Sequence, residues 1–410
     1  MSEQPRIIQL DERTIGHIAA GEVVERPAQV VKELIENSID AGANKITIDV
    51  ERGGFDLIRI LDDGSGIHSE DLPLALDRHA TSKLRSQADL AAIGTLGFRG
   101  EALASIGMVS KLSISSRPLG TEGCRIVMDN GDNGKTERAG IAEGTCIEVA
   151  HIFINKPARL AFQRRPATET SRIVDVVVSH AISHPEVGFR LVSDEKIILE
   201  VPAVDGMEDR LYDILGRQAG RMIEISSPPS DDAAPGDENW HGWISTPDIT
   251  RGKGDDIHIL INGRPVAAQP FLQSIRRGYR TRLMQGRHPV AVLLLELPPD
   301  EVDVNVHPTK REVRLRHSWR VLERLERAIA HTLESTPTEP ESSGGITGIT
   351  SLAPQTTEKR NVEKPAWAQT AQHSLSPFYN SDATDEQHRM KLRCPTFSQH
   401  KQHKKTYTRE

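Results

Sequence analysis

The chain has 410 residues, a hydrophobic content of 37% and a formal net charge of −7, which suits two or three globular domains, each with its own core. No stretch approaches the roughly 18 consecutive apolar residues of a membrane-spanning helix, and the first residues form no apolar secretory segment. The cysteines, Cys124, Cys146 and Cys394, lie far apart and form no CxxC unit, which argues against a disulfide or zinc framework. These features predict a cytoplasmic protein.

The first strong helical pattern is Pro27–Ala41, followed by Gly42 at a position typical of a helix end. Glu33 and Asn37 lie one turn apart in it, roughly 40° apart around the helix axis. A glutamate can activate a water, and an asparagine oxygen can ligate a hard cation such as Mg²⁺. The pair therefore indicates metal-assisted attack on a phosphate. The alternative is an ordinary solvated helix face.

Helical and strand-like patterns alternate through the first half of the chain. Further helices are expected at Thr14–Glu25, Ser69–Asp77, Glu101–Ile106 and Thr168–Ser183. Strands are expected at Lys45–Val50, Leu57–Leu61, Ser110–Ser116, Arg125–Met128, Thr145–Ile154, Phe189–Val192 and Ile197–Glu200. This mixture predicts an α+β sandwich with helices on one face of a mainly antiparallel sheet.

A carboxylate followed by a Gly-x-Gly turn closes the second expected strand, at Asp62, Gly64 and Gly66. An aspartate at that place could accept a hydrogen bond from an exocyclic amine such as that of adenine. The glycines would let the backbone approach a ligand closely. A simple hairpin turn is the alternative.

A second glycine cluster, Gly94–Gly100, precedes the expected helix Glu101–Ile106. Its backbone N–H groups and the helix dipole suit phosphates, and its flexibility suits a lid. His79–Lys83 adds hydroxyls and an ammonium just before it, and Thr145 adds one more hydroxyl. Turn or cap chemistry is the alternative for each piece. The sequence contains no GxxxxGK[ST], so a Walker-type phosphate loop is excluded.

A polar loop rich in Pro and Asp, Ser226–Asn239, lies near the start of a second unit. That unit is expected to contain strands near Asp256–Asn262 and Pro289–Leu297, a basic helix near Gln269–Arg282 and a final helix Trp319–Leu333. Eleven Lys/Arg face five Asp/Glu between Leu260 and Arg320. This excess indicates a polyanion-binding face, with a solvated basic helix as the alternative.

After Glu334 the chain becomes rich in Ser, Thr, Pro and Gln and loses its periodicity, so Ser335–Glu410 is expected to be disordered. The spacing of the potential ligands in this tail fits no standard metal site. These are His388, Cys394, His400 and His403.

The segments ELIEN, DDGSGI, GFRGEAL and GT follow one another over little more than a hundred residues. This order resembles the ATP-binding fold shared by DNA gyrase B subunits, Hsp90 chaperones, histidine kinases and MutL mismatch-repair proteins. Within that superfamily, four segments resemble the MutL family nearly residue for residue: Ile18–Ala43, Arg78–Lys83, Leu96–Ile106 and Val302–Arg314. The resemblance implies a GHKL (Bergerat-type) ATPase sandwich over residues 1–205, a ribosomal-protein-like α/β second domain over 206–334 and a disordered tail over 335–410.

The resemblance also implies ATP and Mg²⁺ as cofactors and assigns roles to residues. Glu33 matches the base that activates the attacking water, and Asn37 matches the Mg²⁺ ligand that bridges the phosphates. Asp62 matches the aspartate that reads the adenine amine. Gly66 belongs to the same turn, and Thr145 supports adenine through its hydroxyl or a water.

The lid and phosphate cradle of the family match Thr81, Ser82, Lys83, Gly97, Phe98, Arg99 and Gly100. Lys310 matches a lysine that reaches the γ-phosphate from the second domain, where a cation stabilises developing charge and reports that the γ-phosphate is present. Family members commonly have asparagine at the position of Asp63, which leaves Asp62 intact. They often read YNTPAR where this chain has Ile154–Arg159.

The function implied by the resemblance is a slow, Mg²⁺-dependent ATPase that acts as a molecular switch in DNA mismatch repair. It would dimerise through its N-terminal region when ATP binds and would couple a MutS-type mismatch-recognition protein to a downstream nuclease or helicase, in the cytoplasm at the nucleoid. It would also contact the DNA backbone without sequence preference. The expected DNA contacts are Arg264, Arg276, Arg277, Arg280 and Arg282.

MutL proteins usually continue into a C-terminal dimerisation domain, which often carries a DQHAxxERxxYE nuclease motif. This sequence has no such motif, so neither constitutive dimerisation nor nicking is expected. A non-catalytic DNA-binding scaffold is the alternative function. Two other members of the superfamily are disfavoured as alternatives. A gyrase-type subunit would also need a DNA-cleaving domain, and a histidine kinase would need a phosphoacceptor helix ahead of the ATP motifs.

Overall fold

The computed structural model describes residues 9, 11, 24–83, 96–97, 100–226, 239–298, 301–303 and 313–336. Met1–Pro337 belongs to one compact unit. Several predictions lie outside the described residues, wholly or almost wholly: the helix Thr14–Glu25, the disordered tail Ser335–Glu410, and the roles of Phe98, Arg99 and Lys310. The domain boundary at residues 205/206 stays a prediction.

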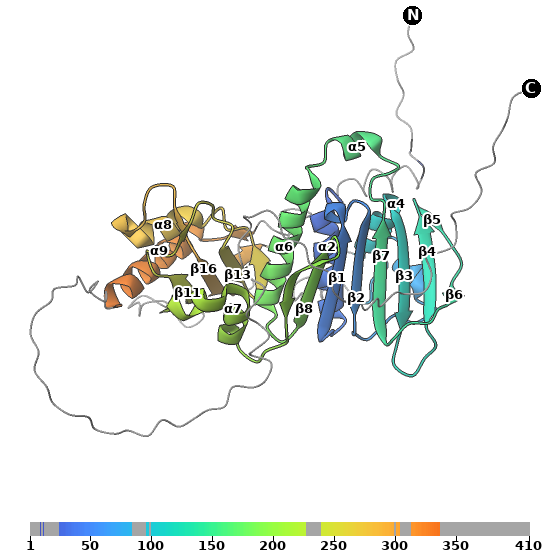
Figure 1. Cartoon of the computed structure of the whole chain (residues 1–410), viewed down its shortest axis with the longest axis horizontal. Coiled ribbons are helices and arrows are strands. Elements are labelled where there is room, and N and C mark those ends of the chain that lie inside the picture. Colours follow the sequence, from blue (N-terminus) through green and yellow to red (C-terminus); the bar gives the residue numbers. More distant parts are fainter. Residues whose placement is uncertain are drawn as a thin grey trace, which may run out of the picture. The chain divides into compact units, whose positions relative to one another are not determined.

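A nine-stranded sheet forms the first half of the unit, in the order β5-β4-β3-β7-β2-β1-β8-β9 with β6 beside β4. Its strands are β1 (Lys45–Glu51), β2 (Leu57–Asp62), β3 (Lys111–Arg117), β4 (Cys124–Asp129), β5 (Asp132–Asn133), β6 (Glu137–Arg138), β7 (Gly144–Ala150), β8 (Gly188–Ser193) and β9 (Lys196–Val201). All neighbouring strands are antiparallel except β1 and β8. Figure 1 shows β1, β2, β7, β3 and β4 side by side.

The helices α2 (Pro27–Asp40) and α6 (Pro166–Ser183) pack with this sheet in one apolar core. Val30 and Leu34 of α2 are fully buried, and alternate residues of β1 such as Ile48 face the same core. That alternation follows from the two-residue period of a strand. Smaller elements complete this part: η1 (Arg52–Gly54), α3 (Leu72–Ala75), α4 (Ala102–Met108) and α5 (Pro157–Ala161).

Two predicted elements are shorter than expected. The helix expected at Ser69–Asp77 is only α3. The strand expected at Thr145–Ile154 ends as β7 at Ala150, because the backbone turns left-handed at His151 (φ 54°) and Phe153 (φ 65°). Left-handed residues cannot continue an extended strand.

The second half contains a five-stranded sheet in the order β10-β11-β16-β13-β14. Its strands are β10 (Met222–Ser226), β11 (Asn239–Ser245), β13 (Ile257–Ile261), β14 (Arg264–Val266) and β16 (Ala291–Glu296). The other elements are α7 (Met207–Leu215), η3 (Gly216–Arg221), β12 (Thr250–Arg251), α8 (Leu272–Tyr279), η4 (Arg280–Arg282), β15 (His288–Pro289), β17 (Val302–Asp303), β18 (Arg314–Leu315) and α9 (Ser318–Ser335). The predicted loop Ser226–Asn239 begins and ends in strands, and its interior lies outside the described residues.

The second core is centred on Trp240, which is fully buried. Its indole N–H donates to the Val321 carbonyl at 3.0 Å, and its ring meets Phe271 edge-on at 5.8 Å. Buried Trp rings need such a partner for the indole N–H. These contacts join α8 and α9 to the second sheet. Within the described part of the chain, we find no helix long and apolar enough to cross a bilayer.

Candidate functional site

Glu33 and Asn37 lie at the border between the buried and exposed faces of α2. The Glu33 side chain is 14% exposed, whereas neighbouring Leu34 is fully buried. Helical projection alone places Glu36 on the polar side of this helix with Glu33, Asn37 and Asp40. In the structure, however, Glu36 is buried together with Lys32, and the two form an ion pair of 2.7 Å. An oppositely charged partner is what allows a carboxylate to be buried.

Asp62 ends β2 in a buried, hydrogen-bonded position. Its carboxylate accepts from the Ser38 hydroxyl at 2.8 Å and from the Gly64 backbone N–H at 3.0 Å. Burial raises the pKa of the Asp62 carboxyl, while the hydrogen bonds from Ser38 and from the Gly64 and Thr145 backbone act to lower it. A carboxylate has about four lone-pair sites, so these donors leave acceptor capacity for a ligand amine.

Thr145 lies opposite Asp62 in the β2–β7 register and opposite Ser116 in the β3–β7 register. The hydroxyl oxygens of Ser116 and Thr145 are 2.9 Å apart, and Ser116 also accepts from the Ile67 backbone N–H at 2.8 Å. The Ser116 hydroxyl also lies 3.1 Å from the Gly144 carbonyl oxygen. Ser116 thus orients Thr145 and ties it to the glycine turn.

Gly66 allows this turn to pass close to another strand. Its φ is 74°, and a Cβ there would lie 2.7 Å from the Pro118 nitrogen and 2.8 Å from the Arg117 backbone. Only glycine fits such a left-handed, crowded position. Asp63, the departure from the family pattern, accepts the backbone N–H groups of Asn44 and Lys45 at 2.8 Å each. It anchors the turn to the start of β1.

Asp40 joins the end of α2 to the predicted lid. Its carboxylate accepts from the Lys83 ammonium at 2.6 Å and from the backbone N–H groups of Leu96 and Gly97 at 2.9 and 3.0 Å. The same ammonium donates to the Asn37 carboxamide oxygen at 2.9 Å. The structure therefore brings Lys83 and Gly97 onto α2, beside Asn37.

The two predicted lid segments also contact each other. The His79 backbone N–H donates to the Gly100 carbonyl at 3.0 Å. Gly100 has φ 60°, and a Cβ there would lie 2.5 Å from the Ala80 carbonyl oxygen. Thr81 and Ser82 are exposed, and the Thr81 hydroxyl accepts a backbone N–H from two residues further on at 3.1 Å.

Replacing Asp40 with alanine is expected to release residues 96–97. Hydrogen bonds to a charged group stabilise by about 1.5–3 kcal/mol, so amide exchange at Leu96 and Gly97 should accelerate by about 10- to 100-fold. Hydrogen exchange resolved to single amides measures this. Asp56→Ala is the control, because Asp56 pairs with Arg52 at the surface, at 3.3 Å. Unchanged protection in Asp40→Ala would contradict this anchoring role.

The metal-ligating oxygens in this region suit Mg²⁺ bound together with a nucleotide better than a metal ion bound by protein groups alone. The Asn37 oxygen already accepts from an ammonium, so it is turned toward a cation position. Among the residues whose structure is described, no group of three or more His, Cys, Asp or Glu could hold a metal ion. Mg²⁺ commonly takes one or two protein ligands and completes its shell with phosphates and water. The residues therefore fit the predicted cofactors.

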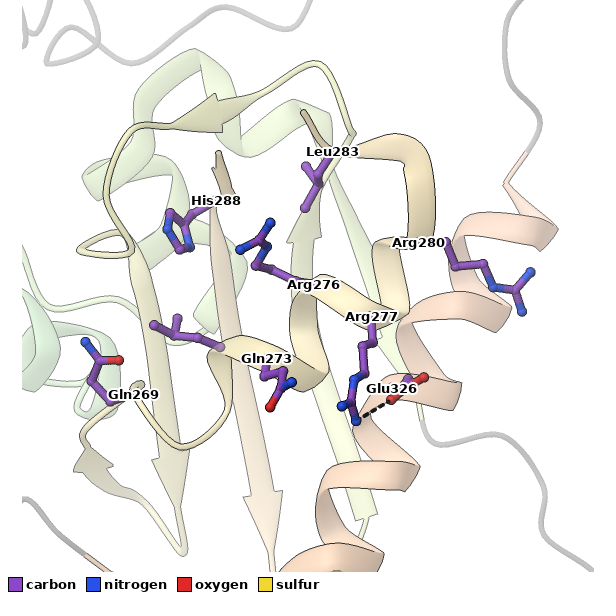
Figure 2. Close-up of a pocket in the computed structure, with 9 residues that line it drawn as sticks. Gln269, Gln273, Arg276, Arg277, Arg280, Leu283, His288 and Glu326 are labelled. Atoms are coloured by element: carbon purple, nitrogen blue, oxygen red, sulfur yellow. Dashed lines mark ion pairs between the residues drawn. The ribbon is translucent and has the colours of Figure 1, made fainter. Parts of the chain in front are cut away.

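A basic cavity of about 780 Å³ opens over α8, lined by Gln269, Leu272, Gln273, Arg276, Arg277, Arg280, Leu283, His288 and Glu326. Figure 2 shows Arg276 on the His288 side of the helix and Arg277 beside Glu326 of α9. The Arg277 guanidinium lies 4.0 Å from the Glu326 carboxylate, and Arg280 forms an ion pair with α9 through Glu334.

Two of the five predicted DNA contacts lie elsewhere. Arg264 is on β14 and Arg282 is in η4, and neither lines the cavity. The structure thus places three of the five arginines, Arg276, Arg277 and Arg280, in the lining of this cavity. Helical spacing alone did not reveal that two of these three pair with carboxylates of α9.

Comparison with known proteins agrees with this geometry. Residues 25–141 match the family described as "Histidine kinase-, DNA gyrase B-, and HSP90-like ATPase", and residues 212–334 match "DNA mismatch repair protein, C-terminal domain". The structure titled "Aquifex aeolicus MutL ATPase domain complexed with ADP" is 28% identical, with a TM-score of 0.52 over 68% of this chain and 94% of that one. The predicted fold class is confirmed: the chain carries a GHKL-type ATPase domain followed by a mixed α/β domain.

Sequence comparison narrows the class. The chain is 43% identical over 336 residues to DNA mismatch repair protein MutL of Anaeromyxobacter dehalogenans, covering 81% of this chain and 54% of that protein. It is 42% identical over 364 residues to the MutL protein of Syntrophotalea carbinolica, covering 88% and 57%. The chain belongs to the MutL family of DNA mismatch repair proteins. It spans about half the length of the curated relatives it matches.

Proposed function

We propose that this chain binds and slowly hydrolyses ATP with Mg²⁺ at the site formed by α2, β2 and β7, and that nucleotide state acts as a switch in DNA mismatch repair. The observation that carries the proposal is the Lys83 contact, which brings a lid cation to the carboxamide of Asn37, one turn from Glu33. The ADP-bound MutL ATPase domain from Aquifex aeolicus supports it.

Nucleotide recognition would depend on the far end of β2. Asp62 would accept the adenine amine, since its buried carboxylate is fixed by Ser38 and the Gly64 N–H. Thr145, oriented by Ser116, would hold the base through its hydroxyl. The left-handed turn at Gly66 would keep the loop after Asp62 packed against the backbone of Arg117 and Pro118.

Hydrolysis would occur at the α2 edge. The half-buried Glu33 carboxylate would take the proton of the attacking water, as general bases do. Mg²⁺, held by the Asn37 oxygen and phosphate oxygens, would neutralise phosphate charge. Lys83 would move from Asn37 and Asp40 toward the phosphates as the lid closes. Lys310 would add a second cation from the second domain.

A phosphate-release assay tests this function against the scaffold alternative. The chain is expected to release phosphate from ATP only when Mg²⁺ is present, with a rate that DNA alters. A scaffold would bind DNA with the same affinity whether or not ATP is present, and would release no phosphate. Absence of turnover in folded, ADP-binding protein would overturn the catalytic proposal.

DNA contact is proposed at the cavity of α8, through phosphates. Replacing Arg276 with alanine is expected to weaken DNA binding and to lower the slope of log K against log salt by about 0.9, the value of one phosphate contact. Replacing Glu326 with glutamine should strengthen binding, because it frees Arg277 from its ion pair. Fluorescence anisotropy at several salt concentrations measures both.

Glu323→Gln is the matched control for the second variant. Glu323 lies on the same helix but pairs with Arg327 at 2.5 Å, one turn away on the exposed surface. Its removal should leave DNA affinity unchanged. Equal strengthening by Glu323→Gln and Glu326→Gln would mean that only net charge matters, and not the cavity.

Partners beyond the nucleotide belong to the proposal as well. Family membership supports an ATP-dependent homodimer through the N-terminal region, and it supports contacts with a MutS-type mismatch-recognition protein and a downstream nuclease or helicase. Light scattering with and without a non-hydrolysable ATP analogue tests the dimer. A mass independent of nucleotide would contradict it.

A further inference from the structure

A buried charge cluster lies directly beneath the proposed catalytic base. Lys32, which precedes Glu33, and Glu36, one turn further on, have side chains that are only 7% and 6% exposed. The Lys32 ammonium lies 2.7 Å from the Glu36 carboxylate and 3.8 Å from the Glu33 carboxylate. One cation is thus shared unequally by two carboxylates, with the close contact on Glu36.

The neighbouring helix α6 completes the cluster. The Nε2 of His180, which is 2% exposed, lies 3.8 Å from the same Glu36 oxygen that contacts Lys32. The Nδ1 of His180 donates to the Val176 carbonyl at 2.8 Å, which fixes the ring. Glu36 therefore lies against α6 in the core, one turn along α2 from Glu33.

The distances suggest what would follow if Glu36 lost its charge. Among the described residues, Glu33 is the other carboxylate that lies within 4 Å of the ammonium, and lysine has a flexible stem that can move by about an ångström. Buried charges are poorly screened, so the attraction would be strong. A Glu33 paired directly with an ammonium is a weaker base and points toward its partner instead of a water.

We propose that Glu36 is a positioning residue for ATP hydrolysis: it holds the Lys32 ammonium away from Glu33 and so leaves the proposed base able to face water. The inference rests on the proposed ATPase function. The effect of Glu36 on the reaction would be indirect, through the position of the Lys32 ammonium.

The test compares a single variant with a double variant. Glu36→Gln keeps the shape and removes the charge, so kcat is expected to fall by about ten-fold, because Glu33 would pair with the ammonium in place of the attacking water. KM and ADP affinity should stay within about two-fold, because binding contacts are untouched. Adding Lys32→Met to Glu36→Gln removes the released ammonium, and kcat should return to within about three-fold of the unmodified chain.

A merely structural role would give a different result. Loss of the buried pair would then lower kcat at least as much in the double variant as in Glu36→Gln. Glu36→Asp, which keeps the charge, should retain most of kcat. A fall in kcat of about ten-fold in Glu36→Asp would contradict the proposal, and this measurement remains available if the glutamine variant does not fold. The matched control is Glu148→Gln, which breaks the 2.8 Å pair with Arg59 on the sheet and should leave kcat unchanged.

The outcomes distinguish failure of the positioning role of Glu36 from failure of the proposed ATPase function. If Glu33→Ala abolishes turnover but Glu36→Gln keeps normal kcat, or the double variant is no faster than Glu36→Gln, the positioning role is overturned and the ATPase function stands. If the unmodified chain releases no phosphate from ATP with Mg²⁺, the proposed function itself fails. If Glu33→Ala turns over normally, the assignment of Glu33 as the base fails, and the positioning role fails with it.

Discussion

Replacing Glu33 with alanine is expected to lower ATP turnover by about 10²- to 10⁴-fold, the range contributed by a positioned general base. The carboxylate lies at the edge of α2, 14% exposed, where it can reach a water outside the core. Its removal leaves Asn37, Asp62 and the glycine turn in place. Nucleotide affinity should therefore change by no more than about two-fold.

Steady-state phosphate release and ADP binding by calorimetry measure the two effects separately. Glu200→Ala is the control, because Glu200 is a surface carboxylate that pairs with Arg190 on the sheet, at 3.6 Å. It should turn over normally. Parallel loss of turnover and of ADP binding in Glu33→Ala would indicate a binding or folding role and would contradict the assignment of the base.

Replacing Asp62 with asparagine is expected to weaken ATP and ADP binding by about 10- to 100-fold, because an amide N–H₂ would oppose the adenine amine where a carboxylate oxygen accepts it. The fold should tolerate the change. The new amide can donate to the Ser38 hydroxyl, which already lies 3.2 Å from the Leu34 carbonyl and can donate there instead.

Asp62→Asn should raise the free energy of unfolding, although it weakens nucleotide binding. Burial raises the pKa of Asp62 in the folded chain, so the ionised carboxyl destabilises the fold at neutral pH relative to the unfolded chain. Asp62→Asn should therefore melt at a higher temperature at pH 7, and the difference should shrink as the pH falls toward the ordinary pKa of aspartate. Thermal unfolding across this pH range measures it. A lower melting temperature at pH 7 would contradict the expected cost of the buried charge.

The sequence predicted the elements whose patterns are local. The helix at Pro27–Ala41 is α2 within one residue, and the strands at Lys45–Val50 and Leu57–Leu61 are β1 and β2. Their apolar residues recur at the spacing of the element they form. The Asp62 turn and the glycine at position 66 also follow from local chemistry.

The residues that organise the site were not evident from the sequence. Ser38 and Ser116 reach Asp62 and Thr145 only through helix–sheet packing and strand register. Asp40 lies within the predicted helix Pro27–Ala41, but its partner Lys83 is 43 residues further along the chain. A serine or aspartate carries no signal of its distant partner.

Elements of the second half were missed for two physical reasons. α7 places Arg210 in a fully buried position, where its guanidinium donates to the Pro185 and Val187 carbonyls at 2.7 Å, so the apolar stripe of the helix is interrupted. β11 contains Gly242, which reads as a strand breaker. A Cβ there would lie 2.2 Å from the Val292 carbonyl oxygen.

Lys83 also bears on the order in which ligands arrive. Its ammonium lies 2.9 Å from the Asn37 oxygen. A divalent ion arriving alone would meet a like charge at short range, where repulsion is strong. Phosphate groups would instead attract the same ammonium away from Asn37 and Asp40. At the proposed ATP site, Mg²⁺ would therefore bind together with the nucleotide and not ahead of it.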